Sequence, residues 1–190
     1  MSSEKASSVL VLMGSPRKKG NSVILAERIA AGAESAGARV ERVFLSELSI
    51  APCRSCYACQ KPESKGCAIN DDMQPIYRKM LAADAWVIAG PVYWFNMSAQ
   101  TKLWMDRCFA FSAYGKNPFA GKRIAIALSY GDVDPFASGC VNALRTFQDA
   151  FRYVGAKIIG MVYGSAMAAG EISSNGQLLK QAESLGKRLA

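Results

Sequence analysis

The chain has 190 residues, with 23 Lys or Arg, 15 Asp or Glu and no His, which gives a net charge of +8. Its 51% hydrophobic and 20% charged residues exclude a mostly disordered protein, and its length predicts a single domain over residues 1–190. Without histidine there can be no Ser-His-Asp triad, Cys-His pair, His-ligated zinc or imidazole base. Any catalysis must therefore use a cofactor or other side chains.

The start of the chain and its charge pattern indicate the compartment and the partners. Residues 1–8 are polar, and the apolar run Val9–Met13 is too short for the core of a signal peptide. No stretch approaches the ~18 apolar residues of a membrane span, so we expect a soluble cytoplasmic protein that does not bind membranes. The basic residues are scattered except for Arg17-Lys18-Lys19, which favours a small anionic ligand over nucleic acid.

Short apolar runs alternate with amphipathic stretches of helical length, as in a parallel sheet covered by helices. The expected strands are Val9–Met13, Arg39–Leu45, Ala85–Ala89, Arg123–Ser129 and Lys157–Val162. The expected helices run from Asn21 or Ser22, as the cap, to Ser35, from Asp71 and Asp72 to Ala82, from Ser98 to Ala113, from Cys140 to Val154 and from Glu171 to Leu189. This predicts an α/β, flavodoxin-like, doubly wound five-stranded parallel sheet of order 2-1-3-4-5, with helices on both faces. Its ligand should lie at the carboxyl ends of the strands, where the order reverses.

The loop after the first strand, residues 14–22, combines small, hydroxyl and basic side chains at a helix N-terminus, a common phosphate-binding arrangement. It contains no G-x-x-x-x-G-K-[ST] motif, so nucleoside triphosphate hydrolysis is not supported, and no G-x-G-x-x-G dinucleotide motif. The alternative is an ordinary strand-to-helix turn with a Ser or Asn cap.

The loop after the third strand, residues 90–98, carries three consecutive aromatic residues, Tyr93, Trp94 and Phe95. Three such rings are hard to bury together, whereas a flat aromatic ligand would use them, with Asn96 and backbone groups at its polar edge. The alternatives are a hydrophobic turn under the next helix or a subunit contact.

Together these loops resemble the NADPH-dependent FMN reductase-like branch of the flavodoxin-fold proteins. The resemblance rests on Gly-Ser-Pro-Arg…Gly-Asn-Ser at 14–22, Gly-Pro-Val-Tyr-Trp at 90–94 and Ser-Ala-Gln-x-Lys…Asp-Arg at 98–107, and spans Val9 to about Val162. It implies that the FMN phosphate is held by Ser15, Arg17, Asn21 and Ser22, and the isoalloxazine ring by Pro91, Val92, Tyr93 and Trp94. In this fold, Ser129, Tyr130 and Gly131 would close the other side of the ring. The resemblance also implies a homodimer or homotetramer formed through the helix of Lys102 and Asp106.

A cysteine-rich loop, residues 52–71, is inserted between the second strand and the next helix. Its spacing is Cys53-x2-Cys56-x2-Cys59-x7-Cys67, and C-x2-C-x2-C begins the bacterial ferredoxin-type motif, so one loop can supply four ligands to a [4Fe–4S] cluster. Zinc, disulfides, reactive thiols near basic residues, and cysteines that hold nothing remain alternatives. The loop, with Asp-Asp-Met following at 71–73, also resembles the iron–sulfur flavoprotein subfamily. Cys108 and Cys140 are expected to be buried thiols without a special role.

These observations favour an FMN-dependent oxidoreductase that accepts electrons from NAD(P)H or a reduced carrier. It would pass them to a small or protein acceptor, either directly or through the cluster. The alternative from another class is a non-enzymatic flavodoxin-like electron carrier that partners a ferredoxin or a larger redox enzyme, an acidic partner suiting the net charge of +8. A weaker third reading is a cysteine metal module on an inert scaffold.

Overall fold

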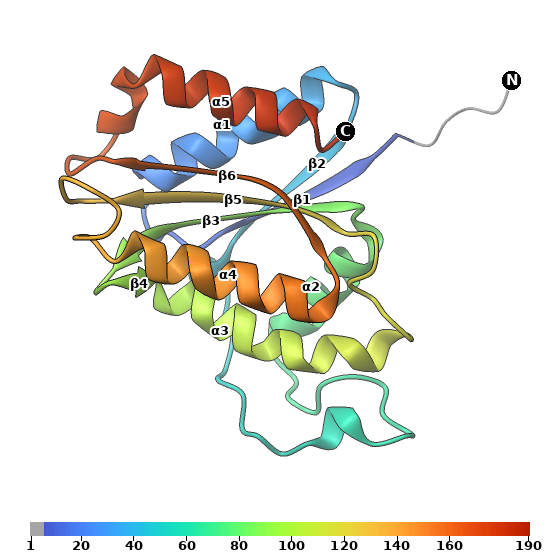
Figure 1. Ribbon diagram of the computed structural model, residues 1–190. Coiled ribbons are helices and arrows are strands. Elements are labelled where there is room, and N and C mark those ends of the chain that lie inside the picture. The colour runs from blue at the N-terminus through green and yellow to red at the C-terminus, as the bar shows by residue number, and fades with distance from the viewer. Residues whose placement is uncertain (1–5) are drawn as a thin grey trace, which may run out of the picture.

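The computed structural model describes residues 6–190 as strands alternating with helices (Figure 1). Part of the polar N-terminal segment considered above, residues 1–5, lies outside the described residues. The strands are β1 (Ser8–Met13), β2 (Arg39–Phe44), β3 (Ala85–Tyr93), β4 (Asn96–Met97), β5 (Arg123–Tyr130) and β6 (Lys157–Ser165). The α-helices are α1 (Asn21–Ser35), α2 (Met73–Ala82), α3 (Ala99–Arg107), α4 (Cys140–Val154) and α5 (Gly176–Lys187). Short 3₁₀ helices are η1 (Leu45–Glu47), η2 (Ala58–Gln60), η3 (Cys108–Tyr114) and η4 (Glu171–Ser174).

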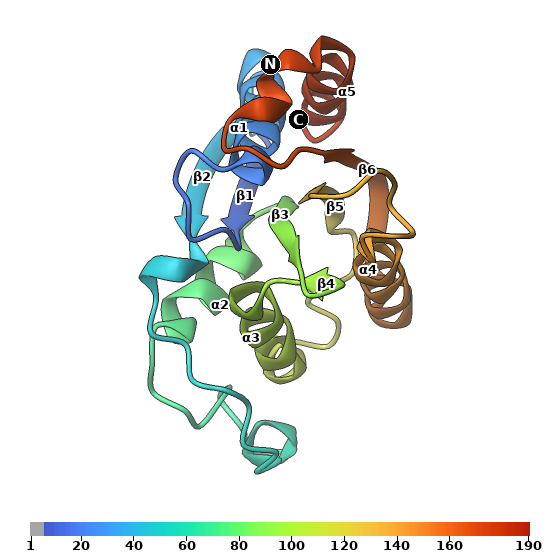
Figure 2. The same ribbon diagram turned by 90° about the vertical axis from the view of Figure 1, so that its left-hand side faces the viewer.

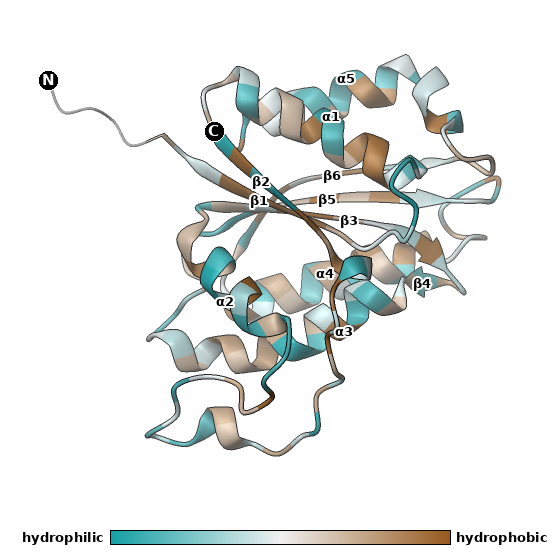
Figure 3. Ribbon diagram, turned by 180° about the vertical axis from the view of Figure 1, so that it is seen from behind, coloured by the Kyte–Doolittle hydropathy of each residue, from teal (hydrophilic) through white to brown (hydrophobic). Residues whose placement is uncertain are grey.

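The sheet has the order β2-β1-β3-β5-β6 with all neighbours on this path parallel, which confirms the predicted flavodoxin-like topology. Helices α1 and α5 cover one face, and α2, α3 and α4 cover the other (Figure 1). Both faces are therefore buried, which explains why β1, β3 and β5 are nearly continuous apolar runs rather than alternating ones. Strands β3 and β5 are accordingly white to brown in Figure 3, between the two helical layers.

Two glycines allow the helices on one face to approach closely. A Cβ added at Gly32 of α1 would lie 2.1 Å from the carbonyl oxygen of Glu183 in α5. A Cβ added at Gly186 of α5 would lie 1.9 Å from the carbonyl oxygen of Ile29 in α1. Each helix thus meets the backbone of the other at a position where only glycine fits.

Some expected boundaries are wrong. The third strand continues past Ala89 to Tyr93 and turns back into β4, which was not expected. The helix expected from Ser98 to Ala113 ends at Arg107. At this point the hydroxyl of buried Tyr77 donates a 2.8 Å hydrogen bond to the Arg107 carbonyl, and the chain continues as the 3₁₀ helix η3.

The helix ends also differ from expectation. The last helix begins at Gly176 rather than Glu171, because the side chain of Asn175 accepts a hydrogen bond from the N–H of Leu178 and caps it. Helix α1 is preceded by Gly20 as the cap, not by Asn21 or Ser22. Across residues 6–190, every helix is too short or too polar to cross a membrane.

The cysteine-rich loop follows η1 and projects beyond the layer of α2 and α3, at the bottom of Figures 1 and 2. Apart from η2, it has no regular secondary structure. The carboxyl ends of the strands face the viewer in Figure 2, so that view displays the edge of the sheet where the ligand site is expected.

Candidate functional site

A cleft of about 180 Å³ lies at the carboxyl ends of β1, β3 and β5, the position expected for a doubly wound sheet. All but two of the predicted cofactor-binding residues line it. They are Ser15, Arg17, Asn21, Ser22, Pro91, Val92, Tyr93, Ser129, Tyr130 and Gly131. Residues that sequence reasoning did not single out, Gly20, Ala166, Met167 and Ala169, complete the lining.

One end of the cleft is the N-terminus of α1. Gly20 has no side chain that could cap the helix, and a Cβ there would lie 3.0 Å from Ser15 Oγ and 3.1 Å from the Arg17 carbonyl oxygen. The tight turn is closed by Ser15 Oγ, which accepts the N–H of Arg17 at 3.1 Å. The first amides of the helix have no partners within it, so Asn21 and Ser22 present N–H groups and the positive end of the helix dipole to the cleft. This end of the cleft suits a phosphate.

The side chain of Asn21 is not free to bind a phosphate. It donates to the carbonyl oxygens of Ala166 at 3.3 Å and Ala168 at 2.9 Å, and accepts the N–H of Ile172 at 3.3 Å. Glu171 holds the same segment by accepting the N–H groups of Met167 and Ala168. Asn21 therefore ties the segment after β6 to the start of α1, beside the cleft.

The other end of the cleft is formed by the ends of β3 and β5. Pro91, Val92 and Tyr93 lie on one side, and Tyr130 and its neighbours Ser129 and Gly131 on the other. Burial raises the pKa of Tyr130, so its hydroxyl stays protonated at neutral pH. Met167 packs directly over Gly131, where an added Cβ would meet the sulfur at 2.6 Å. These groups suit one edge of a flat ring.

The remaining two predicted residues lie outside the cleft lining. Trp94 is 93% exposed at the tip of the β3–β4 hairpin, where Trp94 and Phe95 have φ angles of 46° and 65°. Asn96 directs its side-chain oxygen to the N–H of Met97, at 2.8 Å. The two-residue turn explains this arrangement, because it ends the strand at Tyr93 and points the next side chains away from the cleft.

The four cysteines of the loop line one small cavity of about 20 Å³, which has room for about one water molecule. Cys53 and Cys56 are exposed, whereas Cys59 and Cys67 are partly buried. Residues 6–190 hold no group of three or more Cys, Asp or Glu side chains close enough to bind a metal ion in this conformation.

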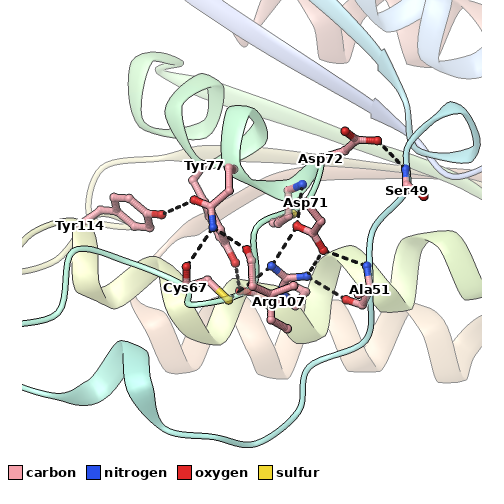
Figure 4. A network of polar contacts seen from close by, with 11 residues as sticks. Ser49, Ala51, Cys67, Asp71, Asp72, Tyr77, Arg107 and Tyr114 are labelled. Atoms are coloured by element: carbon pink, nitrogen blue, oxygen red, sulfur yellow. Dashed lines mark hydrogen bonds and ion pairs between the residues drawn. The ribbon is translucent and has the colours of Figure 1, made fainter.

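Arg107 anchors this loop to the end of α3 (Figure 4). Its Nη1 donates to Asp71 Oδ2 at 2.6 Å and to the Ala51 carbonyl at 2.8 Å, and its Nη2 donates to Asp71 Oδ1 at 3.1 Å and Cys67 Sγ at 3.3 Å. Burial opposes ionisation of Asp71, but the hydrogen bonds from Arg107 and from the N–H groups of Ala51 and Met73 outweigh it and lower its pKa. Burial likewise opposes the charge on Arg107, but its pKa is raised by Asp71.

Partly buried polar groups near Arg107 fix the second end of the loop (Figure 4). Gln74 donates to the carbonyl oxygens of Cys67 at 2.9 Å and Ile69 at 2.7 Å, and accepts a 3.4 Å hydrogen bond from Tyr114. Sequence reasoning missed both residues. Tyr114 lies 40 residues from Gln74, and the bonds from Gln74 to backbone carbonyls within the irregular loop leave no motif in the sequence.

The donor chemistry of the cavity fits an iron–sulfur cluster. Four thiols surround it, and the Nε of Arg107, although buried, has no hydrogen-bond partner within residues 6–190. A group with sulfur acceptors in the cavity would satisfy this donor. Cys108 and Cys140 line neither the cleft nor this cavity; burial raises the pKa of both thiols, that of Cys140 to about 11.

Comparison with curated proteins identifies relatives named for two redox centres. An iron-sulfur flavoprotein of Methanosarcina thermophila is 38% identical over 120 residues, 63% of this chain and 61% of the relative, so the match spans less than two thirds of that protein. An iron-sulfur flavoprotein of Archaeoglobus fulgidus is 30% identical over 184 residues, 94% of this chain and 77% of the relative.

Solved structures share the fold along almost the whole chain. The Trp repressor binding protein from Bacillus subtilis has a TM-score of 0.70 at 25% identity, covering 96% of this chain and 98% of that one. An NAD(P)H:quinone oxidoreductase from Methanothermobacter marburgensis has a TM-score of 0.74 at 21% identity, covering 97% and 98%. The sequence model of one family, NADPH-dependent FMN reductase, matches residues 7–184. This chain therefore belongs to the NADPH-dependent FMN reductase family.

Proposed function

We propose that this protein is an FMN-dependent oxidoreductase that accepts electrons from NAD(P)H and passes them to a small or protein acceptor. The observation that carries the proposal is the cleft itself, which joins an uncapped helix N-terminus to the ends of β3 and β5. FMN, when bound, accepts hydride and releases electrons as a pair or singly.

The residues of the cleft have distinct roles in this proposal. Ser15, Arg17, Ser22 and the first amides of α1 bind the phosphate, and Asn21 acts by holding the segment 166–172 against them. Pro91, Val92 and Tyr93 lie along one edge of the ring, and Ser129, Tyr130 and Gly131 along the other. Trp94 and Asn96 shape the hairpin behind Tyr93.

We also propose that Cys53, Cys56, Cys59 and Cys67 hold a [4Fe–4S] cluster. Such a cluster transfers single electrons. The shared cavity, the unpaired donor of Arg107 and the names of the relatives support this assignment. Because the cavity has room for about one water molecule and a [4Fe–4S] cluster is much larger, the exposed segment of Cys53 and Cys56 must move outward when the cluster is assembled.

The first test is to purify the protein without oxygen, record its absorption spectrum and measure FMN, iron, acid-labile sulfide and zinc. We expect flavin bands on broad iron–sulfur absorption, and anaerobic bleaching of the flavin by NADPH or NADH. Flavin without iron and sulfide would contradict the cluster, and zinc in their place would favour the structural-metal alternative. Failure of the pure protein to bind added FMN would contradict the proposed function as a whole.

A second candidate is a carrier that exchanges electrons with a larger protein but not with a nicotinamide. The net charge of +8 and the exposed Arg54, Lys61 and Lys65 on the cysteine-rich loop favour an acidic partner. The two functions are separated by stopped-flow reduction. Fast reduction by a reduced ferredoxin with no reduction by either nicotinamide would favour the carrier, and the reverse would favour the reductase.

A further inference from the structure

Arg107 contacts both ends of the cysteine-rich loop and one of its thiols. Its guanidinium donates to the Ala51 carbonyl at 2.8 Å, just before Cys53, and to Cys67 Sγ at 3.3 Å, at the last cysteine. Asp71 accepts from Arg107 and from the N–H of Ala51, at 2.9 Å, so the pair closes the base of the loop from both sides.

Arg107 and its partner Asp71 form a buried ion pair rather than a surface one. The side chain of Arg107 is 1% exposed and that of Asp71 is 10% exposed, so the charge and its partner are both removed from water. Burying two charges costs solvation free energy, and two well-packed apolar side chains often give the fold the same stability. Stability alone therefore does not explain this ion pair. The Nε donor that remains unpaired within residues 6–190 belongs to the same guanidinium, which lines the cavity of the four cysteines.

We propose that Arg107 is a positioning residue that fixes Cys67 as a ligand and raises the reduction potential of the iron–sulfur centre through hydrogen bonds to sulfur. The inference rests on the cluster assigned under the proposed function. Hydrogen bonds to ligand sulfur and nearby positive charge stabilise the reduced, more negative state of a cluster, and both come from this one side chain. Asp71 limits this increase in the reduction potential, because its carboxylate partly neutralises the charge of the guanidinium.

This assignment predicts changes of opposite sign at the two members of the pair. Arg107→Gln removes the charge and the guanidinium donors, and Arg107→Lys removes the planar fork, so both should lower the cluster potential, the first by more. Asp71→Asn leaves the guanidinium without a counter-charge and should raise the potential. If the ion pair only held the loop in place, all three variants would lose cluster content, and their reduction potentials would not shift in opposite directions.

The measurement is a redox titration followed by electron paramagnetic resonance, on anaerobically purified FMN-loaded protein, together with iron and sulfide content. Arg145→Gln is the matched control, because Arg145 pairs with Asp149 at 2.8 Å on the surface, with its side chain 70% exposed. The control should titrate like the wild type. Equal potentials in the wild type and the Arg107 and Asp71 variants would overturn the inference.

A second measurement uses the unmodified chain and does not depend on the folding of a variant. With ¹⁵N-labelled arginine, pulsed electron paramagnetic resonance of the reduced cluster should detect coupling to an arginine nitrogen. Arg54 is the other arginine that lines the cavity, so coupling should persist in Arg54→Lys. Absence of coupling in the wild type, or its loss in Arg54→Lys, would overturn the inference even if the Arg107 variants lose the cluster.

These results separate the inference from the proposed function on which it rests. Wild-type protein that binds FMN but contains no iron or sulfide would overturn the cluster, and the role of Arg107 with it. Wild-type protein with a full cluster and no arginine coupling would overturn only the role of Arg107.

Discussion

The side-chain amide of Asn21 donates a 2.9 Å hydrogen bond to the carbonyl of Ala168, joining the first turn of α1 to the segment that follows β6. A second bond to Ala166 and one accepted from Ile172 complete this connection. Ala166 and its neighbour Met167 line the cleft. Asn21 therefore fixes the position of this segment relative to the start of α1, which forms another part of the cleft.

Replacing Asn21 by Ala should therefore weaken FMN binding without direct loss of a phosphate ligand. Each hydrogen bond contributes roughly 0.5–1.5 kcal/mol, so losing the connection should lower FMN affinity about tenfold. Fluorescence titration with FMN measures this. Asn142→Ala is the control, since its amide donates to Phe95 outside the cleft and should leave affinity unchanged. Unchanged affinity in Asn21→Ala would contradict this role.

The phosphate end of the cleft can be tested by charge alone. Ser22→Asp places a carboxylate beside the α1 N-terminus, where it competes with an anion for the same amides. Repulsion at such short range should reduce FMN affinity at least about a hundredfold. Ser22→Asn has nearly the same shape without the charge and is the matched variant for the titration. Similar affinities of the Asp and Asn variants would show that the phosphate lies elsewhere.

The sequence predicted the sheet order because fully buried parallel strands leave apolar runs that are easily recognised, as in β1 and β5. It also predicted most of the cleft, since loops at the carboxyl ends of the strands meet at one edge. It could not predict how side chains pair across long sequence separations. The family resemblance implies that Asn21 is a phosphate ligand, but the partners of its side chain lie more than a hundred residues away. Arg107 and Asp71 stand in two separate motifs, and nothing local in the sequence indicates that they bind each other.

The crossing of α1 and α5 depends on glycine. Gly32→Ala adds a methyl group 2.1 Å from the backbone oxygen of Glu183, and this oxygen cannot move without shifting α5. We expect the free energy of unfolding to fall by about 1–3 kcal/mol, measured by urea denaturation. Gly176→Ala, at the open start of α5, is the control and should be neutral or slightly stabilising. A loss in the control equal to that in Gly32→Ala would contradict the packing argument.

The pair of Asp71 and Arg107 should make stability depend on acid. The pKa of Asp71 is lower in the folded state than its ordinary value of about 3.9. The ion pair therefore contributes fully to the free energy of unfolding above that ordinary pKa, and this contribution is lost as the pH falls through the lower folded value. At neutral pH, Asp71→Asn should cost about 3–5 kcal/mol, because it leaves the buried guanidinium uncompensated. Urea denaturation of both proteins should give a constant difference from pH 7 to about pH 5 that narrows at lower pH. A difference that stays constant down to about pH 3 would contradict the assigned shift.

Neighbouring aromatic residues at the end of β3 should behave differently. Tyr93 lines the cleft, whereas Trp94 is 93% exposed at the hairpin tip, in a left-handed conformation that costs a bulky residue about 1–2 kcal/mol. Trp94→Asn should therefore keep FMN affinity within about twofold while stabilising the fold by up to about 1 kcal/mol, since Asn tolerates this turn.

Tyr93→Leu, one residue earlier, should weaken FMN binding and shift the flavin absorption bands, because it changes the surface beside the ring. Thermal unfolding measures the stability of the two variants, and FMN titration measures their affinity for the cofactor. If Trp94→Asn loses affinity and Tyr93→Leu does not, then Trp94 turns inward over the flavin when FMN binds, as the family resemblance implies.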